Sequence, residues 1–423
     1  SSPLCLVADG LSGKGCLEAR VDAFHSLYKS LLDRGADVNQ VDKDTQRTPL
    51  GAVLTGFRRD DLSDRQSELL RECHSDLLDR GVRLDALVKR GGATPFAEIL
   101  DLLGTLNDES RVSSMCSLAR DMVRKDKSVL NGCQGDGRTT LGVVFQVLRK
   151  PGIGEEALSE IRDFGREIID GGVGLNDPIA TDKGAPLVEA TMAMANKEVS
   201  PESAEVFNRL AAALIDKHID LETQGRASMD VLVGGMVDTE LSTERVSLLS
   251  DIARSLLKKD KVNVDGGDDR PLAKMVEIFI GDADDAYDAR VEALNPFFED
   301  LIDRDGIDVN GDMRVGEHAV SPLAAVVKKI VEEEFSPERL EQLEGLSDKL
   351  LGKGAHANIT GRFVHAGVEE EDNLISAVSK KYFNEDTETS PEKLEALRKL
   401  SISLCHKGAV IANQAFDDIC ADV

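Results

Sequence analysis

The feature that most constrains this chain is a repeat of about 46 residues. The segment LLDRG at 31–35 returns unchanged at 77–81. Paired apolar residues of the kind that close a helix recur at Leu31/Leu32, Leu77/Leu78, Met122/Val123, Ile168/Ile169, Leu214/Ile215, Leu256/Leu257, Leu301/Ile302, Leu350/Leu351 and Leu404/Cys405. Neighbouring pairs are 42 to 54 residues apart, and most are 45 or 46 apart. A period of this size is typical of an array in which each unit packs against its neighbours.

Two further landmarks keep the same register. A polar residue, most often Asn, follows each apolar pair, at Asn39, Asp85, Asn131, Asn176, Glu222, Asp265, Asn310, Asn358 and Asn413. A Pro-Leu-like step also recurs, as SPL at 2–4, TPL at 48–50, TPF at 94–96, TTL at 139–141, APL at 185–187, RPL at 270–272 and SPL at 321–323. Because three independent landmarks share one period, chance does not explain the repeat.

Each unit is expected to contain two helices. The Pro-Leu step would open the first helix, since the first helical position does not need an N–H group. The SPE segments at 200–202, 336–338 and 390–392 would open the second helix. They supply a Ser cap and an acid near the positive end of the helix dipole. Glycines in a left-handed conformation would end the second helix, at Gly35, Gly81, Gly171 and Gly354.

Two helices, followed by GADVN at 35–39 and then TPL at 48–50, resemble the ankyrin repeat. The resemblance covers nearly the whole chain and implies an all-α solenoid of about nine helix-turn-helix repeats, with partial repeats at both ends. The units exceed the usual ankyrin length of about 33 residues by about 13. Shared equally, this excess would lengthen each helix by roughly 10 Å. The usual His after Pro-Leu is also missing. The expected units are 1–47, 48–93, 94–138, 139–184, 185–227, 228–270, 271–321, 322–372 and 373–423.

The charge and the cysteines limit the partners and the compartment. A net charge of −27 disfavours nucleic acid and anionic membranes, which both bind cationic surfaces. No apolar run approaches the roughly 18–20 residues of a membrane span. The seven cysteines are scattered and form no CxxC pair, which favours reduced thiols and a cytoplasmic location.

No enzyme signature survives inspection. The segment GLSGKGC at 10–16 has the wrong spacing for a phosphate loop and is better explained as a turn between helices. DVNGDMRVGEHA at 308–319 lacks the Gly at position 6 and the Glu at position 12 of a calcium loop. The pairs Cys73-His74 and Cys405-His406 are adjacent on helices and do not face each other. Cys405 also takes a core position. We therefore expect no catalytic, metal or cofactor-binding residues.

A basic residue near the end of each turn is the main candidate for partner binding. These residues are Arg47, Arg90, Arg138, Lys183, Arg226, Arg270, Arg314 and Arg362. In an array they would form a row with roughly 10 Å between members. The alternative is local pairing with turn carboxylates at Asp44, Asp136, Asp182, Asp269 and Asp312. Phe363, in the longer turn at 358–373, would either anchor a partner from an exposed loop or pack back onto a helix.

The ankyrin resemblance implies a non-enzymatic protein-binding scaffold that uses its concave face. The expected partner is a protein, held through an acidic segment on the basic turn row or through a basic surface on the acidic face, and the chain is expected to be a monomer. A second hypothesis is that the chain is the substrate-recognition region of a larger multidomain enzyme, such as a bacterial effector secreted into a host cytosol. The opening SSPL, inside a partial repeat, allows this.

Overall fold

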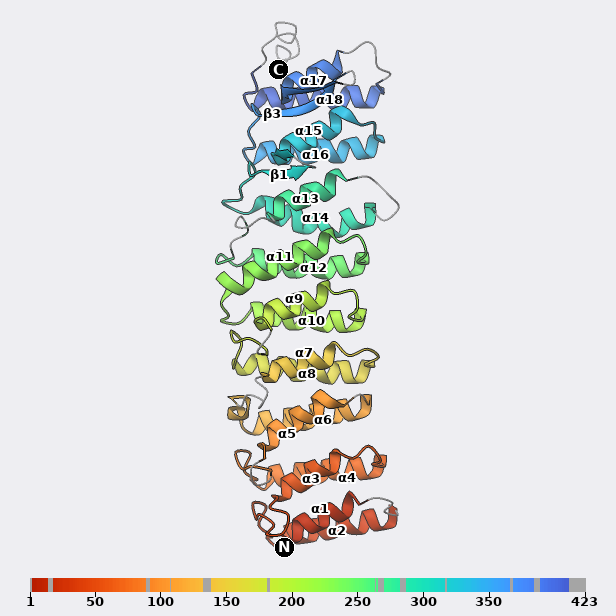
Figure 1. Ribbon diagram of the computed structural model, residues 1–423, viewed down its shortest axis with the longest axis vertical. Helices are drawn as coiled ribbons and strands as arrows, with labels where there is room; N and C mark the ends of the chain where they lie inside the picture. The colour runs from red at the N-terminus through yellow and green to blue at the C-terminus, as the bar shows by residue number, and fades with distance from the viewer. Residues whose placement is uncertain are drawn as a thin grey trace. The chain divides into compact units, whose positions relative to one another are not determined.

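The computed structural model divides into two units, Ser1–Asp220 (unit 1) and Leu221–Val423 (unit 2), and each is described by itself (Figure 1). The structure describes the chain except residues 1, 14–17, 89–91, 107, 132–137, 181–182, 263, 265–269, 282–286, 316–317, 366–367, 384–388 and 411–423. Both units consist mainly of α-helices that alternate between short and long along the chain.

Unit 1 stacks its helices in chain order. Its short helices, of 9 to 11 residues, are α1 (Pro3–Leu11), α3 (Pro49–Phe57), α5 (Pro95–Thr105), α7 (Thr140–Leu148) and α9 (Pro186–Ala195). Its long helices, of 15 to 17 residues, are α2 (Glu18–Asp33), α4 (Asp64–Asp79), α6 (Glu109–Lys125), α8 (Glu155–Gly171) and α10 (Pro201–Ile215). A 3₁₀ turn, η1 (Lys127–Asn131), follows α6. Short helices contact short ones and long helices contact long ones, which gives two layers.

Unit 2 has the same order. Its short helices are α11 (Arg226–Val237), α13 (Pro271–Ile280), α15 (Pro322–Glu332) and α17 (Leu374–Tyr382). Its long helices are α12 (Thr243–Leu257), α14 (Tyr287–Asp303), α16 (Pro337–Gly352) and α18 (Pro391–His406). A π-helical turn, η2 (Leu221–Gly225), precedes α11. Two antiparallel hairpins lie in the turns: β1 (Met313–Val315) pairs with β2 (His318–Val320), and β3 (Thr360–His365) pairs with β4 (Val368–Asn373).

The expected helix starts are confirmed. Prolines at the Pro-Leu steps and in the SPE segments occupy the first helical turn. The preceding Thr or Ser caps the helix, as where the Thr48 hydroxyl accepts the Gly51 N–H at 3.0 Å and Ser336 accepts the Arg339 N–H at 3.3 Å. The second helix of each pair is the longer one, so the extra residues of each unit are not divided equally between the two helices.

The apolar pairs form the core that joins successive helix pairs. Leu77, Ile168, Leu214 and Leu350, for example, are at most 1% exposed. Two details differ from expectation. Gly172, and not Gly171, takes the left-handed conformation after α8, because the helix runs one residue further than its sequence suggests. Cys405 is half-buried and disulfide-bonded, so it is neither a core residue nor a reduced thiol.

The landmark asparagines connect one turn to the next. The Asn39 side chain accepts the Arg83 N–H at 2.8 Å, and Asn176 accepts the Asp220 N–H at 2.7 Å. In unit 2, Asn310 accepts the N–H of residue 356 at 2.7 Å and donates to the Gly354 carbonyl at 3.2 Å. Each bond spans 44 to 46 residues. The repeated Asn is therefore a structural bridge between turns.

A basic or amide side chain early in a long helix caps the short helix of the preceding helix pair. Short-helix carbonyls at the C-terminus lack helical partners and need donors. Arg111 in α6 donates to the Phe57 carbonyl of α3 at 2.7 Å. Lys393 in α18 donates to the Glu333 carbonyl after α15 at 2.6 Å, although it is fully buried. These contacts fix the helix pairs to one another.

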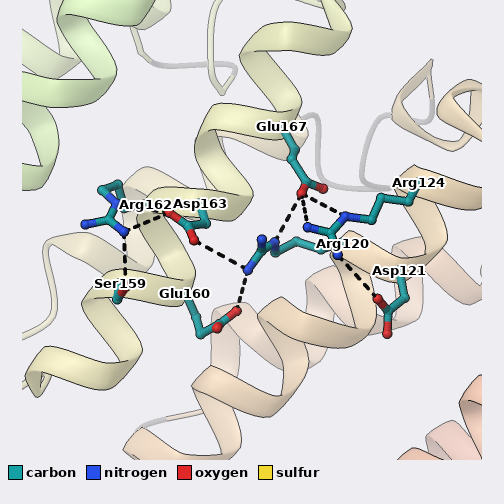
Figure 2. A network of polar contacts seen from close by, with 8 residues as sticks. All are labelled: Arg120, Asp121, Arg124, Ser159, Glu160, Arg162, Asp163 and Glu167. Atoms are coloured by element: carbon teal, nitrogen blue, oxygen red, sulfur yellow. Dashed lines mark hydrogen bonds and ion pairs between the residues drawn. The ribbon is translucent and has the colours of Figure 1, made fainter.

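Ion pairs also bridge the long helices. Arg120 in α6 reaches across to α8 and contacts Glu160 at 2.7 Å and Glu167 at 3.3 Å (Figure 2). Arg124 joins the same Glu167 at 2.7 Å. Figure 2 shows Asp163 on the other side of Arg120, shared with Arg162. Much of the surface charge is thus engaged within the protein.

Candidate protein-binding surface

The turns between helix pairs are held as fixed platforms. In the first turn, the Asp42 N–H donates to the Arg47 carbonyl at 2.8 Å, which closes a small loop. The Asp42 carboxylate accepts the backbone N–H groups of Thr45 and Ser2 at 2.7 and 2.6 Å. These bonds hold the pKa of Asp42 well below its usual range, because they favour the charged carboxylate. The Thr48 N–H then donates to the Val88 carbonyl of the following turn at 3.1 Å.

Two members of the expected basic row are engaged in ion pairs. Arg47 contacts Asp9 on α1 at 2.6 Å and is 17% exposed. Arg270 contacts Asp308, in the turn that follows, at 2.9 Å. The carboxylates in these two pairs lie outside the turn that carries each arginine. Asp136, Asp182 and Asp269, which were expected to pair locally, lie outside the described residues. Such pairing weakens the positive field that Arg47 and Arg270 offer to a ligand.

The other members differ among themselves. Arg138 donates to the Gln146 side chain of α7. Lys183, Arg226 and Arg362 are exposed, and in the described part of the chain no ion pair involves them. Arg226 begins α11 and is not in a turn. Arg90 lies outside the described residues, and of Arg314 only the backbone, in β1, is described. The six members whose side chains are described therefore differ from one another in exposure and in pairing.

Phe363 does not serve as an exposed anchor. Its side chain is 0% exposed, on the face of β3 that contacts α15 and α17. Successive residues of a strand point to opposite faces, so Arg362 and Val364 face solvent instead. The packed-back alternative is the correct one, and Val364, at 46% exposure, is the apolar side chain that this hairpin presents.

One exposed apolar position that recurs on the turns was not predicted from the sequence. Val41 and Leu87 are 49% and 46% exposed. Each lies two residues after a landmark polar residue, Asn39 or Asp85, so they occupy equivalent positions in successive turns. We call these two side chains the turn-tip pair. The sequence could have revealed this position. When the repeat units are aligned, both turns carry an apolar residue among polar ones, two positions after the landmark residue.

The rejected chemical motifs have structural roles. Cys73 and His74 are both fully buried in α4. Burial raises the pKa of the Cys73 thiol to about 12 and lowers the pKa of His74 to about 3, so neither group is charged near neutrality. In the calcium-like segment, Asp308 and Asn310 are occupied by the contacts described above.

The described residues contain no cluster of three or more His, Cys, Asp or Glu side chains arranged to hold a metal ion. None of the described helices has both the length and the apolar character that crossing a bilayer requires.

Comparisons with known proteins show distant structural likeness. The sequence matches no family model and no curated protein. The Uso1-2 crystal structure aligns with 96% of this chain and 61% of its own, at 9% identity and a TM-score of 0.35. The SYS-1/POP-1 complex aligns over 98% and 77%, at 8% identity and 0.33. Kap121p bound to RanGTP aligns over 99% and 42%, at 9% identity and 0.31. The chain thus spans less than two thirds of the first and third of these proteins.

Proposed function

We propose that the chain is a protein-binding scaffold and that its stacked turns carry the contact surface. The observation that supports this most is the turn-tip pair. Val41 and Leu87 hold equivalent positions on turns joined by the bond from Thr48 to Val88. A single exposed apolar residue is ordinary, but a repeated one on a rigid platform offers a partner a regular surface.

The chemistry around the turn-tip pair suggests the kind of partner. Exposed Lys43 follows Val41, and exposed Lys183 lies in a later turn of unit 1. Apolar side chains on the same stack of turns as exposed cations suit a partner segment with apolar residues flanked by acids. Helices such as α3 and α10 begin with a proline and are capped by a Thr or Ser side chain. These helix–turn–helix units support our further proposal that the units are lengthened ankyrin-type repeats.

The test compares two leucines of equal exposure. Leu87 is on a turn and Leu27, at 48% exposure, is on α2. Wild type, Leu87→Ser and Leu27→Ser would be used to capture proteins from a eukaryotic cytosolic lysate, with quantitative mass spectrometry, after circular dichroism shows equal folding. We expect Leu87→Ser alone to lose a protein that wild type retains. Equal capture by wild type and both variants would refute the proposed surface.

A further inference from the structure

A groove lies between α14 and α16 in unit 2 and encloses about 640 Å³. Its lining includes the apolar residues Phe279, Val291, Pro296, Phe298 and Leu346, together with Gly345 and the polar residues Asn295, Gln342 and Lys349. The rings of Phe279 and Phe298 contact each other, with centroids 4.9 Å apart. The volume falls within the range of about 300–1,000 Å³ that is usual for ligand-binding clefts.

Three structural details characterise the groove. The two helices approach each other less closely than α12 approaches α14 or α16 approaches α18. A Cβ atom on Gly345 would have no atom within 4 Å, so no neighbour fills the space beside this glycine. Pro296 lies inside α14 and has no N–H, so the carbonyl of Glu292 lacks its helical donor. The wide spacing of the two helices and the empty space beside Gly345 therefore leave the groove open.

The rim of the groove is acidic. Asp288 and Glu292 on α14 and Glu341 on α16 line it, and all three side chains are exposed. In the part of the chain that the structure describes, no ion pair joins any of them to a basic residue. The three carboxylates therefore lie beside the apolar wall without a direct ion pair, although Glu341 is close enough to Lys399 to interact with it electrostatically.

This rim differs from the other contacts between long helices of unit 2. Arg254 bridges α12 to Asp300 of α14 at 2.7 Å, and Lys399 bridges α18 to Glu344 of α16 at 3.2 Å. Between α14 and α16, Lys349 pairs with Glu299, nearer the C-terminal ends of both helices. Lys349 itself lines the groove, but among the described residues no such bridge reaches Asp288, Glu292 or Glu341.

We propose that this groove binds a segment of a partner protein that carries arginine or lysine beside apolar residues. Cationic side chains of the partner would contact Asp288, Glu292 and Glu341, while its apolar side chains cover the groove wall. The aromatic wall already receives a cation, since the Lys349 ammonium lies 5.8 Å from the Phe298 ring centroid. The surface belongs to the long helices and is independent of the turn-tip pair.

The test measures fluorescence anisotropy of a labelled peptide in which arginine and leucine alternate at helical spacing. One groove variant removes charge, as Asp288→Asn, Glu292→Gln and Glu341→Gln together. Its matched control removes the same charge from exposed acids of unit 1, as Asp64→Asn, Glu155→Gln and Glu202→Gln together. A second groove variant, Gly345→Leu, fills the space without changing the charge and adds a better helix former, so it should fold.

We expect the charge variant and Gly345→Leu each to weaken binding by about tenfold or more, as the loss of several partly exposed contacts implies. The unit 1 control and wild type should bind alike. An equal loss in the control would show diffuse attraction to an acidic chain and overturn the proposal. Wild-type affinity in Gly345→Leu would overturn it as well. The proposal is also overturned if sedimentation shows that wild type is a dimer and that Gly345→Leu dissociates it, because the occupant of the groove would then be a second copy of the chain.

Discussion

Arg339 Nη2 in α16 donates a hydrogen bond to the carbonyl oxygen of Phe279 at 2.6 Å, although 60 residues separate the two in sequence. The same guanidinium reaches the Gly281 carbonyl at 3.0 Å and lies 4.2 Å from the Tyr287 ring centroid. Phe279 and Gly281 are at the C-terminal end of α13. One buried side chain therefore supplies the donors that this helix end lacks.

We expect Arg339→Ala to lower the free energy of unfolding by about 2 to 3 kcal/mol, because it leaves buried carbonyls without donors. Urea denaturation followed by circular dichroism measures this. Arg398→Ala is the control, since Arg398 is exposed and, among the described residues, forms its ion pair with Glu395 on its own helix. If the two variants unfold at the same urea concentration, the capping role of Arg339 is wrong.

The repeat, the helix starts and most of the core could be predicted because they depend on local physics. Proline, Ser caps and the 3.6-residue period act within a few residues of each other. The landmark asparagines were detected, but their function was not, since Asn310 bonds to a backbone group 46 residues away. Arg339 and Lys393 were missed for the same reason, although both stand three residues after a capping serine.

The candidate site was harder to predict. Whether an arginine is free depends on which carboxylate comes near it in space, as Arg47 with Asp9 shows. The burial of Phe363 depends on a strand that the sequence did not reveal in a chain otherwise made of helices. Exposure and pairing are properties of the packed array, so a single repeat unit does not encode them.

Gly142 is required by close packing between turns. A Cβ atom here would lie 2.2 Å from the Ile179 carbonyl oxygen, which accepts the Thr139 N–H at 2.9 Å and the Thr139 hydroxyl at 3.4 Å. We expect Gly142→Ala to destabilise the protein by about 1 to 3 kcal/mol, through displacement of that turn. Gly234→Ala, in open space on α11, should stabilise by about 0.5 to 1 kcal/mol. Thermal unfolding of both variants measures these changes in stability. If Gly142→Ala is more stable than wild type, the close packing between Gly142 and Ile179 is wrong.

Stability should fall in mild acid because of His74. Its pKa is about 3 in the folded protein, owing to burial, against about 6.5 when unfolded. Between these values the unfolded chain binds the extra proton, so the free energy of unfolding decreases as pH falls from 6.5 toward 3. We expect His74→Leu to reduce this slope by up to about 1.4 kcal/mol per pH unit. Above pH 7.5 the slopes of wild type and variant should agree, and equal slopes at pH 5 would refute the assignment.

Asn310→Ala should loosen one turn without unfolding its unit. The variant removes the acceptor of the residue 356 N–H and the donor to the Gly354 carbonyl. We expect faster hydrogen exchange at residue 356, by about fivefold to tenfold for the loss of roughly 1 kcal/mol. Mass spectrometry of peptides from this turn measures it. The Asp220 amide, held by Asn176 in unit 1, is the internal control and should not change.

The bond from Asn39 to Arg83 has a consequence for synthesis on the ribosome. The acceptor is made 44 residues before its donor. At a translation rate of about 5–20 residues per second, it waits roughly 2 to 9 s for its partner. During that interval the newest turn of a growing chain lacks its bridge, while the older turns are already joined. Folding during translation would then advance from the N-terminus one turn at a time, always one unit behind the chain that has emerged.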